Sequence, residues 1–447
     1  MKKLILALLT SNSYKVMFLI FVSNLTPRVD YVFKHICTRI LGLSIKFTTN
    51  LEEFLAHHGP KMSYGKRPLG GEYFVQAHDL LFVQGIEDIE VPVRSWGETI
   101  GIFPTPERGQ LPFDIFAGGF YLLSRYEEYL PHVKDDLGRY PFTESLAFRH
   151  DFLQWPVVDQ WAVKFGLTLQ SAYPELMMPL RHFKVHSIVE AKRPYEFLQR
   201  GLVRSCIGLL GDLYKLKIGR VLQRFQVLSG RRKDPYDTFN WLLNNVKGNR
   251  SKLTLFFMLG EGYSFREDFN TKQERFRQLI KMTSDYVEVG LVLSYHWLLN
   301  QNQIKSEKQQ MEELTHRPLS ATFNDRQMVQ LPQVYRSLVE LEVASDYTMY
   351  YYNKLGFRAG TCTPFLFYDL DFEVKTPLVL QPVVGKSLAL NYGKASDIEG
   401  AVMALFRTVE KVKGTFMFMF SNRDFEPSVD NKIWRYLFSE KLMLRER

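Results

Sequence analysis

His296 is a candidate functional residue, because it lies just after a continuous apolar run that predicts a buried strand. The stretch VGLVLSYHWLLN covers residues 289–300, and its apolar part stops at Ser294 and Tyr295. In α/β proteins, ligands and catalytic groups collect at the carboxyl ends of buried strands. His296 is therefore a candidate for a working ligand, for the remnant of a lost site, or for an ordinary polar residue at a strand end.

Glu127 and Glu128, beside Arg125, look at first sight like a pair of carboxylates for acid–base chemistry. They close the amphipathic run 113–130, which predicts a helix, and adjacent positions on a helix do not face each other. We interpret them as a solvated or salt-bridged helix end rather than as a catalytic pair.

Strand-like apolar runs recur through the back half of the chain and alternate with helical stretches. They cover residues 183–190, 253–260, 286–294, 346–353, 378–384 and 415–421. Buried strands that alternate with helices predict a parallel sheet or barrel. The irregular spacing favours a distorted barrel, so we expect an α/β fold with a (β/α) barrel over residues 181–447.

The front part, residues 17–180, predicts a smaller α+β domain. Strand-like runs cover 18–24 and 44–50, and helical spacing covers 27–43 and 156–177. Asn50 is expected to cap the helix that begins at Leu51. Residues 1–16 imitate a signal peptide, but the apolar core LILALL is short and polar TSNSYK follows it. We interpret 1–16 as an over-extended start, with Met17 as the natural first residue and secretion as the alternative.

The net charge and the cysteine content limit which binding partners and which cellular compartment are expected for the protein. The formal net charge is +9, which permits acidic partners, yet no zinc-finger spacing or RNA-binding signature accompanies it. Nucleic acid is therefore not expected as a partner. The cysteines Cys37, Cys206 and Cys362 match no metal spacing and no disulfide framework. A reducing, cytoplasmic location is the simplest interpretation.

Residues 200–233 form a basic insert with nine Lys or Arg and a single Asp. Its apolar residues could form one stripe: Leu209, Leu213, Leu216, Val221, Leu222 and Phe225. Such a segment could lie on an anionic membrane surface as a peripheral contact. A helical arm packed on its own domain is the alternative, since the internal glycines Gly208, Gly211 and Gly219 weaken a long continuous helix.

Several stretches resemble the polysaccharide-deacetylase-like proteins of the Bacteroidetes type. In that family an uncharacterised N-terminal domain precedes a NodB-homology domain of carbohydrate esterase family 4. The stretches are FDIFAGGFYLLSRYEEYL, SLAFRHDFLQWPVVDQWA, DPYDTFNWL, LTLFFMLG, VGLVLSY, DYTM, FYDLDFEVKTPL and, most specific, GFRAGT at 356–361. The resemblance implies a distorted (β/α) barrel and, in intact members, metal-dependent hydrolysis of an N-acetyl group on a sugar polymer.

Such hydrolysis requires a divalent metal that polarises the carbonyl group and lowers the pKa of a bound water. It also requires a carboxylate base for that water and an acid for the departing amine. A catalytic metal usually has about three protein ligands and one open position.

The resemblance places the family's metal and catalytic positions on residues of which Glu190 could still act as a base, whereas the others cannot supply these groups. They are Glu190 and Lys192 for the strand-end Asp pair, Val292 for the motif histidine, Met328 for a further histidine, and Ser421 for the late acid. A lysine cation repels a metal, valine has no lone pair, and a thioether is a poor ligand for a hard divalent ion.

Two positions keep some of the pattern. His296 lies four residues after Val292, as in an HxxxH motif, and with Glu190 it would give two ligands, too few for a firm site. Arg358 of GFRAGT is unchanged and is expected to pair with Glu190.

The resemblance and these substitutions together predict a polysaccharide deacetylase-like protein without catalytic activity, acting in glycan or cell-surface polysaccharide metabolism as a binding or partner protein. Binding candidates near the expected cleft mouth are Tyr295, Trp297, Arg358, Tyr368 and Asp369. No metal or cofactor is expected. The alternatives are an active zinc- or other metal-dependent deacetylase and a membrane-peripheral component of polysaccharide assembly.

Overall fold

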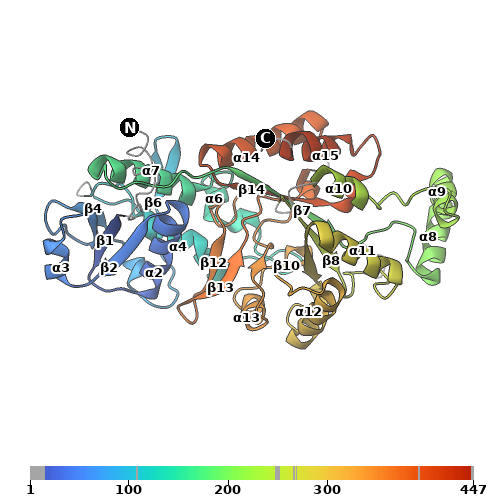
Figure 1. Cartoon of the computed structure of the whole chain (residues 1–447), viewed down its shortest axis with the longest axis horizontal. Coiled ribbons are helices and arrows are strands. Elements are labelled where there is room, and N and C mark those ends of the chain that lie inside the picture. The colour runs from blue at the N-terminus through green and yellow to red at the C-terminus, as the bar shows by residue number, and fades with distance from the viewer. Residues whose placement is uncertain are drawn as a thin grey trace, which may run out of the picture. The chain divides into compact units, whose positions relative to one another are not determined.

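The computed structural model describes residues 16–106, 109–246, 252–264, 267, 269–390 and 393–443. The chain divides into two compact units (Figure 1). Unit 1 contains the described part of Met1–Leu122 and Val157–Arg181, and unit 2 contains Leu123–Pro156 and the described part of His182–Arg447. The leader-like stretch 1–16 lies, except for Val16, outside the described residues.

Unit 1 is built on a parallel sheet of strand order β2-β1-β3-β4. The strands are β1 (Met17–Val22), β2 (Ser44–Thr48), β3 (Lys61–Gly65) and β4 (Tyr73–Gln76), with a hairpin of β5 (Val93–Trp96) and β6 (Thr99–Ile102). The helices are α2 (Pro27–Phe33), which continues into a π-helix (Lys34–Ile40), α3 (Leu51–Ala56), α4 (Ile115–Leu123) and α7 (Val157–Ala172). Because these four strands are parallel and joined by crossovers, the expected α+β arrangement is wrong, and the unit is of the alternating α/β type.

Asn50 caps α3 as the sequence predicted. Its side-chain oxygen accepts hydrogen bonds from the backbone N–H groups of Glu52 at 2.8 Å and Glu53 at 3.2 Å. The run 113–130 does not form one helix, because Arg125 adopts a left-handed backbone conformation with φ of 56° between α4 and α5 (Tyr126–Tyr129).

Unit 2 contains, among its described residues, an eight-stranded sheet of order β12-β13-β11-β10-β9-β8-β7-β14. The strands are β7 (Lys184–Ala191), β8 (Leu253–Met258), β9 (Glu288–Leu293), β10 (Ala321–Asn324), β11 (Ser345–Asp346), β12 (Phe365–Asp369), β13 (Val374–Leu380) and β14 (Thr415–Ser421). All neighbours pair in parallel except β12, which is antiparallel to β13.

The strands predicted at 183–190, 253–260, 286–294 and 415–421 are confirmed. The run 378–384 holds only the last part of β13, and the prediction over 346–353 is wrong beyond Asp346. There the Asp346 side chain accepts a hydrogen bond from the backbone N–H of Thr348 at 2.9 Å, a turn that ends the strand. Two short strands, β10 and β12, were not predicted.

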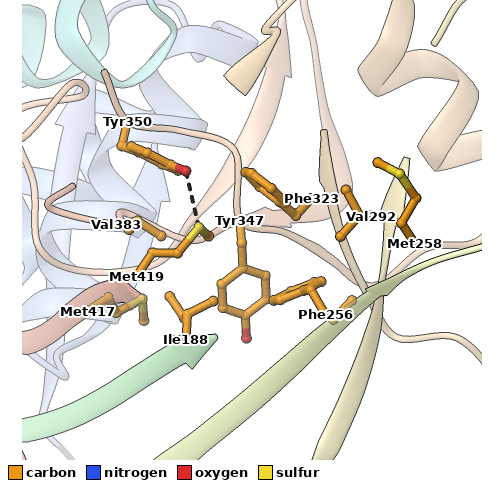
Figure 2. Close-up of a cluster of buried hydrophobic side chains, with 11 residues drawn as sticks. Ile188, Phe256, Met258, Val292, Phe323, Tyr347, Tyr350, Val383, Met417 and Met419 are labelled. Carbon is orange, nitrogen blue, oxygen red and sulfur yellow. Dashed lines mark hydrogen bonds between the residues drawn. The ribbon is translucent and has the colours of Figure 1, made fainter. Parts of the chain in front are cut away.

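The sheet of unit 2 is curled, so that its inward side chains meet in one core. Strand β14 shows the alternation: Met417 and Met419 point into the core, while Phe416, Phe418 and Phe420 point the other way and contact the aromatic rings of α14, α15 and the segments beside α15. Strands contribute Ile188, Phe256, Met258, Val292, Ala321, Phe323, Met417 and Met419 to this core, and the segments after β11 and β13 contribute Tyr347, Tyr350 and Val383 (Figure 2).

The curled sheet is partly closed by the segment that follows β13. Val384 N–H bonds Met417 O, Met419 N–H bonds Gly385 O, and Lys386 forms a parallel bridge with Met419. This segment therefore runs along the outer edge of β14. The expected distorted (β/α) barrel is confirmed as far as this curled and incompletely closed sheet.

Helices cover the outer side of the sheet and extend beyond it (Figure 1). They are α6 (Leu146–Arg149), α8 (Leu202–Tyr214), α9 (Ile218–Leu228), α10 (Phe239–Val246), α11 (Glu274–Tyr286), α12 (Gln301–Thr315), α13 (Gln333–Glu340), α14 (Ala395–Lys411) and α15 (Lys432–Tyr436). None of the helices in the described ranges is long and apolar enough to cross a membrane.

The segment Leu123–Pro156 belongs to unit 2, which the sequence analysis did not anticipate. Arg125 bonds the backbone oxygen of Arg358, and the backbone N–H of Phe357 donates to Leu153 O at 2.8 Å. These contacts tie the segment to the GFRAGT loop.

Candidate functional site

Glu190 lies on the inner face of β7, close to the carboxyl end of the strand. Side chains alternate along a strand, so Glu190 shares its face with Ile188, which is in the hydrophobic core. In the sheet register Glu190 stands beside Ser421 of β14 and Phe256 of β8. The side chain is 1% exposed.

Two ammonium groups hold the carboxylates at this strand end. Lys386 Nζ lies 2.5 Å from Glu190 Oε1, and Lys192 Nζ lies 4.0 Å from the same oxygen. Lys192 Nζ also donates a hydrogen bond of 2.7 Å to Oδ1 of Asp325, which is fully buried. Glu190, Asp325, Lys192 and Lys386, which we call the charge cluster, thus pair two carboxylates with two cations.

The cations set the protonation state of Glu190. Burial alone would raise its pKa, but Lys192 and Lys386 outweigh burial and lower the pKa to about 2. The pKa of Lys192 is raised, because Glu190 and Asp325 outweigh the effect of burial. Glu190 is therefore ionised and Lys192 is charged at neutral pH.

The charge cluster borders a pocket of about 200 Å³. Its lining residues are Glu190, Lys192, Arg193, Glu267, Arg326, Gln327, Tyr352, Lys386, Leu388, Ser421 and Arg423. Most of the lining cations already have acidic partners: Arg193 pairs with Glu196 and Arg326 pairs with Glu267. The second carboxylate oxygen of Glu190, Oε2, is buried and has no hydrogen-bond partner among the described residues.

Three of the sequence candidates meet at this pocket. Glu190, Lys192 and Ser421 line it, and Gln327, next to Met328, lines it as well. Ser421 caps the short helix that follows β14, because its backbone N–H donates to Asp424 Oδ2 at 2.7 Å in a capping box. Met328 itself is 2% exposed and is not among the lining residues.

Val292 does not line the pocket but packs in the core beneath the strand ends. It stands beside Met258 and Phe323 in the sheet register and is fully buried (Figure 2). The position that the resemblance assigns to a metal-binding histidine is therefore part of an apolar core.

The residues present do not fit a catalytic divalent metal. No group of three or more His, Cys, Asp or Glu side chains that could hold a metal ion occurs within the described ranges. At the strand ends, the two carboxylates already face the ammonium groups of Lys192 and Lys386, which repel a metal ion and carry no lone pair while protonated.

His296 contacts Tyr263, and no contact with Glu190 occurs among the described residues. It is exposed, on the short helix Tyr295–Trp297, and its Nε2 lies 3.1 Å from the backbone oxygen of Tyr263. His296 also stacks on the Tyr263 ring, with centroids 5.7 Å apart. His296 is not among the residues that line the pocket at Glu190.

Trp297 and Tyr295 occupy different surroundings. Trp297 lines a groove of about 820 Å³, whose other residues include Phe269, Gln303 and Gln310. The Tyr295 hydroxyl group donates to the backbone oxygen of Leu137 at 3.4 Å. Trp297, one of the candidates for binding, therefore borders an open groove.

Arg358 pairs with Glu128, and the expected pairing with Glu190 is wrong. Its Nε and Nη2 lie 2.8 Å and 2.6 Å from the two Glu128 oxygens, and Arg125 Nε donates to Oε1 at 2.7 Å. All three side chains are buried. Burial raises the pKa of Glu128, but Arg358 and Arg125 bring it down to about 2. The interpretation of Glu128 as a salt-bridged residue near a helix end thus agrees with the structure. The salt bridge is buried rather than solvated.

Tyr368 and Asp369 lie at the wrong end of the sheet for a cleft mouth. Strand β12 is antiparallel to β13, and Asp369 stands opposite Val374, the first residue of β13. Asp369 therefore sits at the amino ends of the parallel strands, where Arg336 binds it through Nε at 2.5 Å and Nη2 at 2.8 Å. Tyr368 is buried and donates to Glu373.

Sequence reasoning missed Asp325, Lys386 and Glu307. Asp325 follows the short strand β10, which was not predicted. Lys386 lies two residues beyond the predicted run 378–384, but no motif marked it as a site residue. Glu307, on α12, is 2% exposed, and burial, which outweighs the interactions with Gln303 and Ser294, raises its pKa to about 7. A lone Glu in a polar helix gives no signal of burial.

Comparison with known proteins gives one family match, in the front part of the chain, and similarities to solved structures. Residues 18–174 match the model of a family of unknown function (DUF7033), which is less than half of the chain. No curated protein matches the sequence. Among solved structures, a candidate polysaccharide deacetylase from Mycobacterium smegmatis is 11% identical with a TM-score of 0.38, over 60% of this chain and 85% of that chain. A CE4 family pseudoenzyme from Bacillus anthracis is 12% identical with a TM-score of 0.28, over 60% of this chain and 66% of that chain. The solved structures that this chain is similar to thus include a candidate polysaccharide deacetylase and a pseudoenzyme, at low identity and low TM-score.

Proposed function

We propose that the protein is a polysaccharide deacetylase-like protein that does not hydrolyse through a metal and that binds a glycan as a binding or partner protein. The motif resemblance, above all GFRAGT at 356–361, supports the family assignment. The charge cluster supports the absence of metal chemistry.

The observation that carries the proposal is the placement of Lys386 and Lys192 on Glu190 and Asp325. A catalytic metal needs free carboxylate or imidazole donors and an open position for water. Here each carboxylate has an ammonium partner, and the apolar Val292 stands where the resemblance expects a histidine. Without a metal, the site has no group to polarise an amide carbonyl and generate hydroxide.

Glycan binding is supported by the groove beside Trp297. The groove of about 820 Å³ combines the rings of Trp297 and Phe269 with the side-chain amides of Gln303 and Gln310. Aromatic faces contact the apolar faces of sugar rings, and a few polar groups fix the orientation of a ligand. The groove is also lined by the charged residues Arg204, Glu261, Lys272, Arg277 and Glu313. This combination suits an oligosaccharide better than a small apolar compound.

Titration calorimetry of the full chain with N-acetylated oligosaccharides tests the binding function. Wild-type protein is expected to bind, Trp297→Ala to bind at least about tenfold more weakly, and the control Phe372→Ala to bind as wild type. Phe372 is 68% exposed and lies outside the groove. Equal binding by wild type and Trp297→Ala, or no binding by either, would contradict the proposal.

The active metal-dependent deacetylase is the alternative for the same fold. It requires stoichiometric zinc in the purified protein together with release of acetate from an N-acetylated oligosaccharide. We expect neither, and both together would overturn the proposed loss of hydrolysis while leaving glycan binding in place.

A further inference from the structure

The basic insert forms a two-helix arm, and its polarity is inverted. Helices α8 and α9, joined at residues 215–217, extend from the end of unit 2 beyond α11 (Figure 1). In a helix of a water-soluble protein the apolar face normally lies inside and the charged face outside. In the arm the charged pair Arg224 and Asp212 lies inside, and many apolar side chains lie outside.

The inside of the arm is held by ion pairs. Arg224 Nη2 lies 2.7 Å from Asp212 Oδ2, and Arg224 is only 2% exposed. Arg220 bonds Asp212 at 3.3 Å and also bonds Glu196, which anchors α9 to unit 2. The Arg224 guanidinium group lies over the Phe197 ring at 4.8 Å. Salt bridges and a cation–π contact therefore fix the inner face.

The outer faces of both helices are apolar and exposed. On α8, Leu202, Leu210 and Leu213 share one face with Cys206, and on α9, Ile218, Leu222 and Phe225 share another, at spacings of three and four. Their exposed fractions are 86% for Leu202, 65% for Leu210, 42% for Leu213, 55% for Ile218, 59% for Leu222 and 55% for Phe225. Tyr214 and Leu216, at the joint, are 89% and 81% exposed. Together these eight residues, without Cys206, are the outer apolar surface.

The charge around this surface is of one sign. Lys215 and Lys217 at the joint, and Arg231 and Arg232 after α9, are exposed. Asp212 is the single acid among residues 200–233, and it is buried against Arg224. The arm thus offers apolar side chains and cations to its surroundings, and no exposed carboxylate that would repel phosphate.

We propose that the arm binds the surface of an anionic membrane. The outer apolar surface enters the boundary between headgroups and acyl chains, while Lys215, Lys217 and the two arginines contact lipid phosphates. The helices contain 13 and 11 residues, too few for the roughly 20 that span a bilayer, so the contact is peripheral. A protein partner of acidic surface is less favoured, because the exposed leucines and the tyrosine require an apolar environment over both helices.

Co-sedimentation of the full chain with vesicles tests the proposal. Vesicles of phosphatidylcholine alone are compared with vesicles of phosphatidylcholine and phosphatidylglycerol, at low and high ionic strength. Binding to the anionic vesicles is expected to be at least about tenfold tighter and to weaken as salt rises. A polarity-sensitive fluorophore on the exposed Cys206 should shift to shorter wavelength on binding, whereas Cys37 and Cys362 are buried.

Two pairs of variants locate the contact. Leu210→Ser/Leu222→Ser/Phe225→Ser should lose binding, whereas Val133→Ser/Leu299→Ser/Val429→Ser, at comparably exposed positions outside the arm, should keep it. Lys215→Glu/Lys217→Glu should lose the preference for anionic vesicles, whereas Lys281→Glu/Lys411→Glu should keep it.

Three outcomes would overturn the membrane proposal. They are equal binding to both kinds of vesicle, no binding at low salt, and oligomerisation of the wild type through the outer apolar surface without vesicle binding. The last outcome would assign the surface to a second copy of the chain. None of these results depends on the glycan site, so the two proposals fail separately.

Discussion

Lys386 and Glu190 form a buried ion pair at the carboxyl end of β7, with 2.5 Å between Nζ and Oε1. Their side chains are 6% and 1% exposed. A buried charge is tolerated when it is paired, and removing one partner leaves the other uncompensated in a medium of low dielectric constant. The pair therefore occupies the strand end where the resemblance expects a metal. The stability of the buried carboxylate there depends on the neighbouring lysines.

The variant Lys386→Met is expected to lower the free energy of unfolding by about 3 kcal/mol, because Glu190 is left buried with the more distant Lys192. Urea unfolding followed by circular dichroism measures the change. The double variant Glu190→Gln/Lys386→Met should recover much of the loss, and Lys305→Met, at an exposed lysine of α12, should change little. An unchanged free energy of unfolding in Lys386→Met would show that the pair contributes nothing to stability.

Removing Arg358 should damage the fold rather than ligand binding alone. Arg358→Ala leaves Glu128 buried with Arg125 as its remaining guanidinium partner, and a loss of about 3 kcal/mol or more in the free energy of unfolding is expected. Glu128→Gln in the Arg358→Ala background should restore part of it. If Arg358→Ala had normal stability but did not bind oligosaccharide, Arg358 would instead be a residue of the binding site.

The positions of the strands were easier to predict than the composition of the site. Strands β8, β9 and β14 are largely apolar runs because both of their faces are mostly buried, and β7 keeps the apolar group Ile188 and Val189 among polar residues. Strand β10 is only four residues long and half of its residues are polar, so no apolar run marks it. Strand β12, FLFYD, is a short apolar run that the sequence analysis did not recognise as a strand.

The site residues depend on contacts between distant segments, which spacing along the chain does not encode. Lys386 reaches Glu190 only because the segment after β13 turns onto the edge of β14. Arg358 was expected near Glu190, but its partner Glu128 comes from a segment that was assigned to the other domain. Ser421 and Glu190 could be placed together because both end recognised strands that proved to be neighbours.

Glu307 should make the stability of the protein depend on pH near neutrality. Its folded-state pKa of about 7 lies above the usual 4.5, so the folded state binds a proton that the unfolded state releases between these values. Stability is then highest below about pH 4.5 with respect to this group and falls by about 3 kcal/mol as pH rises through 7. Unfolding free energies at pH 6 and pH 8 measure the slope.

Glu307→Gln is the matched variant for this titration, because it removes the charge and keeps the size. It should be more stable than wild type at pH 8 and lose the dependence on pH between 6 and 8. Glu313→Gln, on the same helix, serves as the control and should retain the wild-type slope. An unchanged slope in Glu307→Gln would assign the titration to another group.

Gly385 is required where the chain passes from β13 to β14. Its φ of 148° is rarely adopted by other residues, and a Cβ atom there would lie 2.4 Å from Leu355 Cδ2. Gly385→Ala should lower the free energy of unfolding by about 2 kcal/mol and shift Lys386 away from Glu190. Gly400→Ala, within α14 and with no atom within 4 Å of the new Cβ, should instead raise it by about 0.5–1 kcal/mol. Chemical denaturation of both variants measures these opposite signs, and equal stability of the two would mean that the edge segment adapts to a side chain at 385.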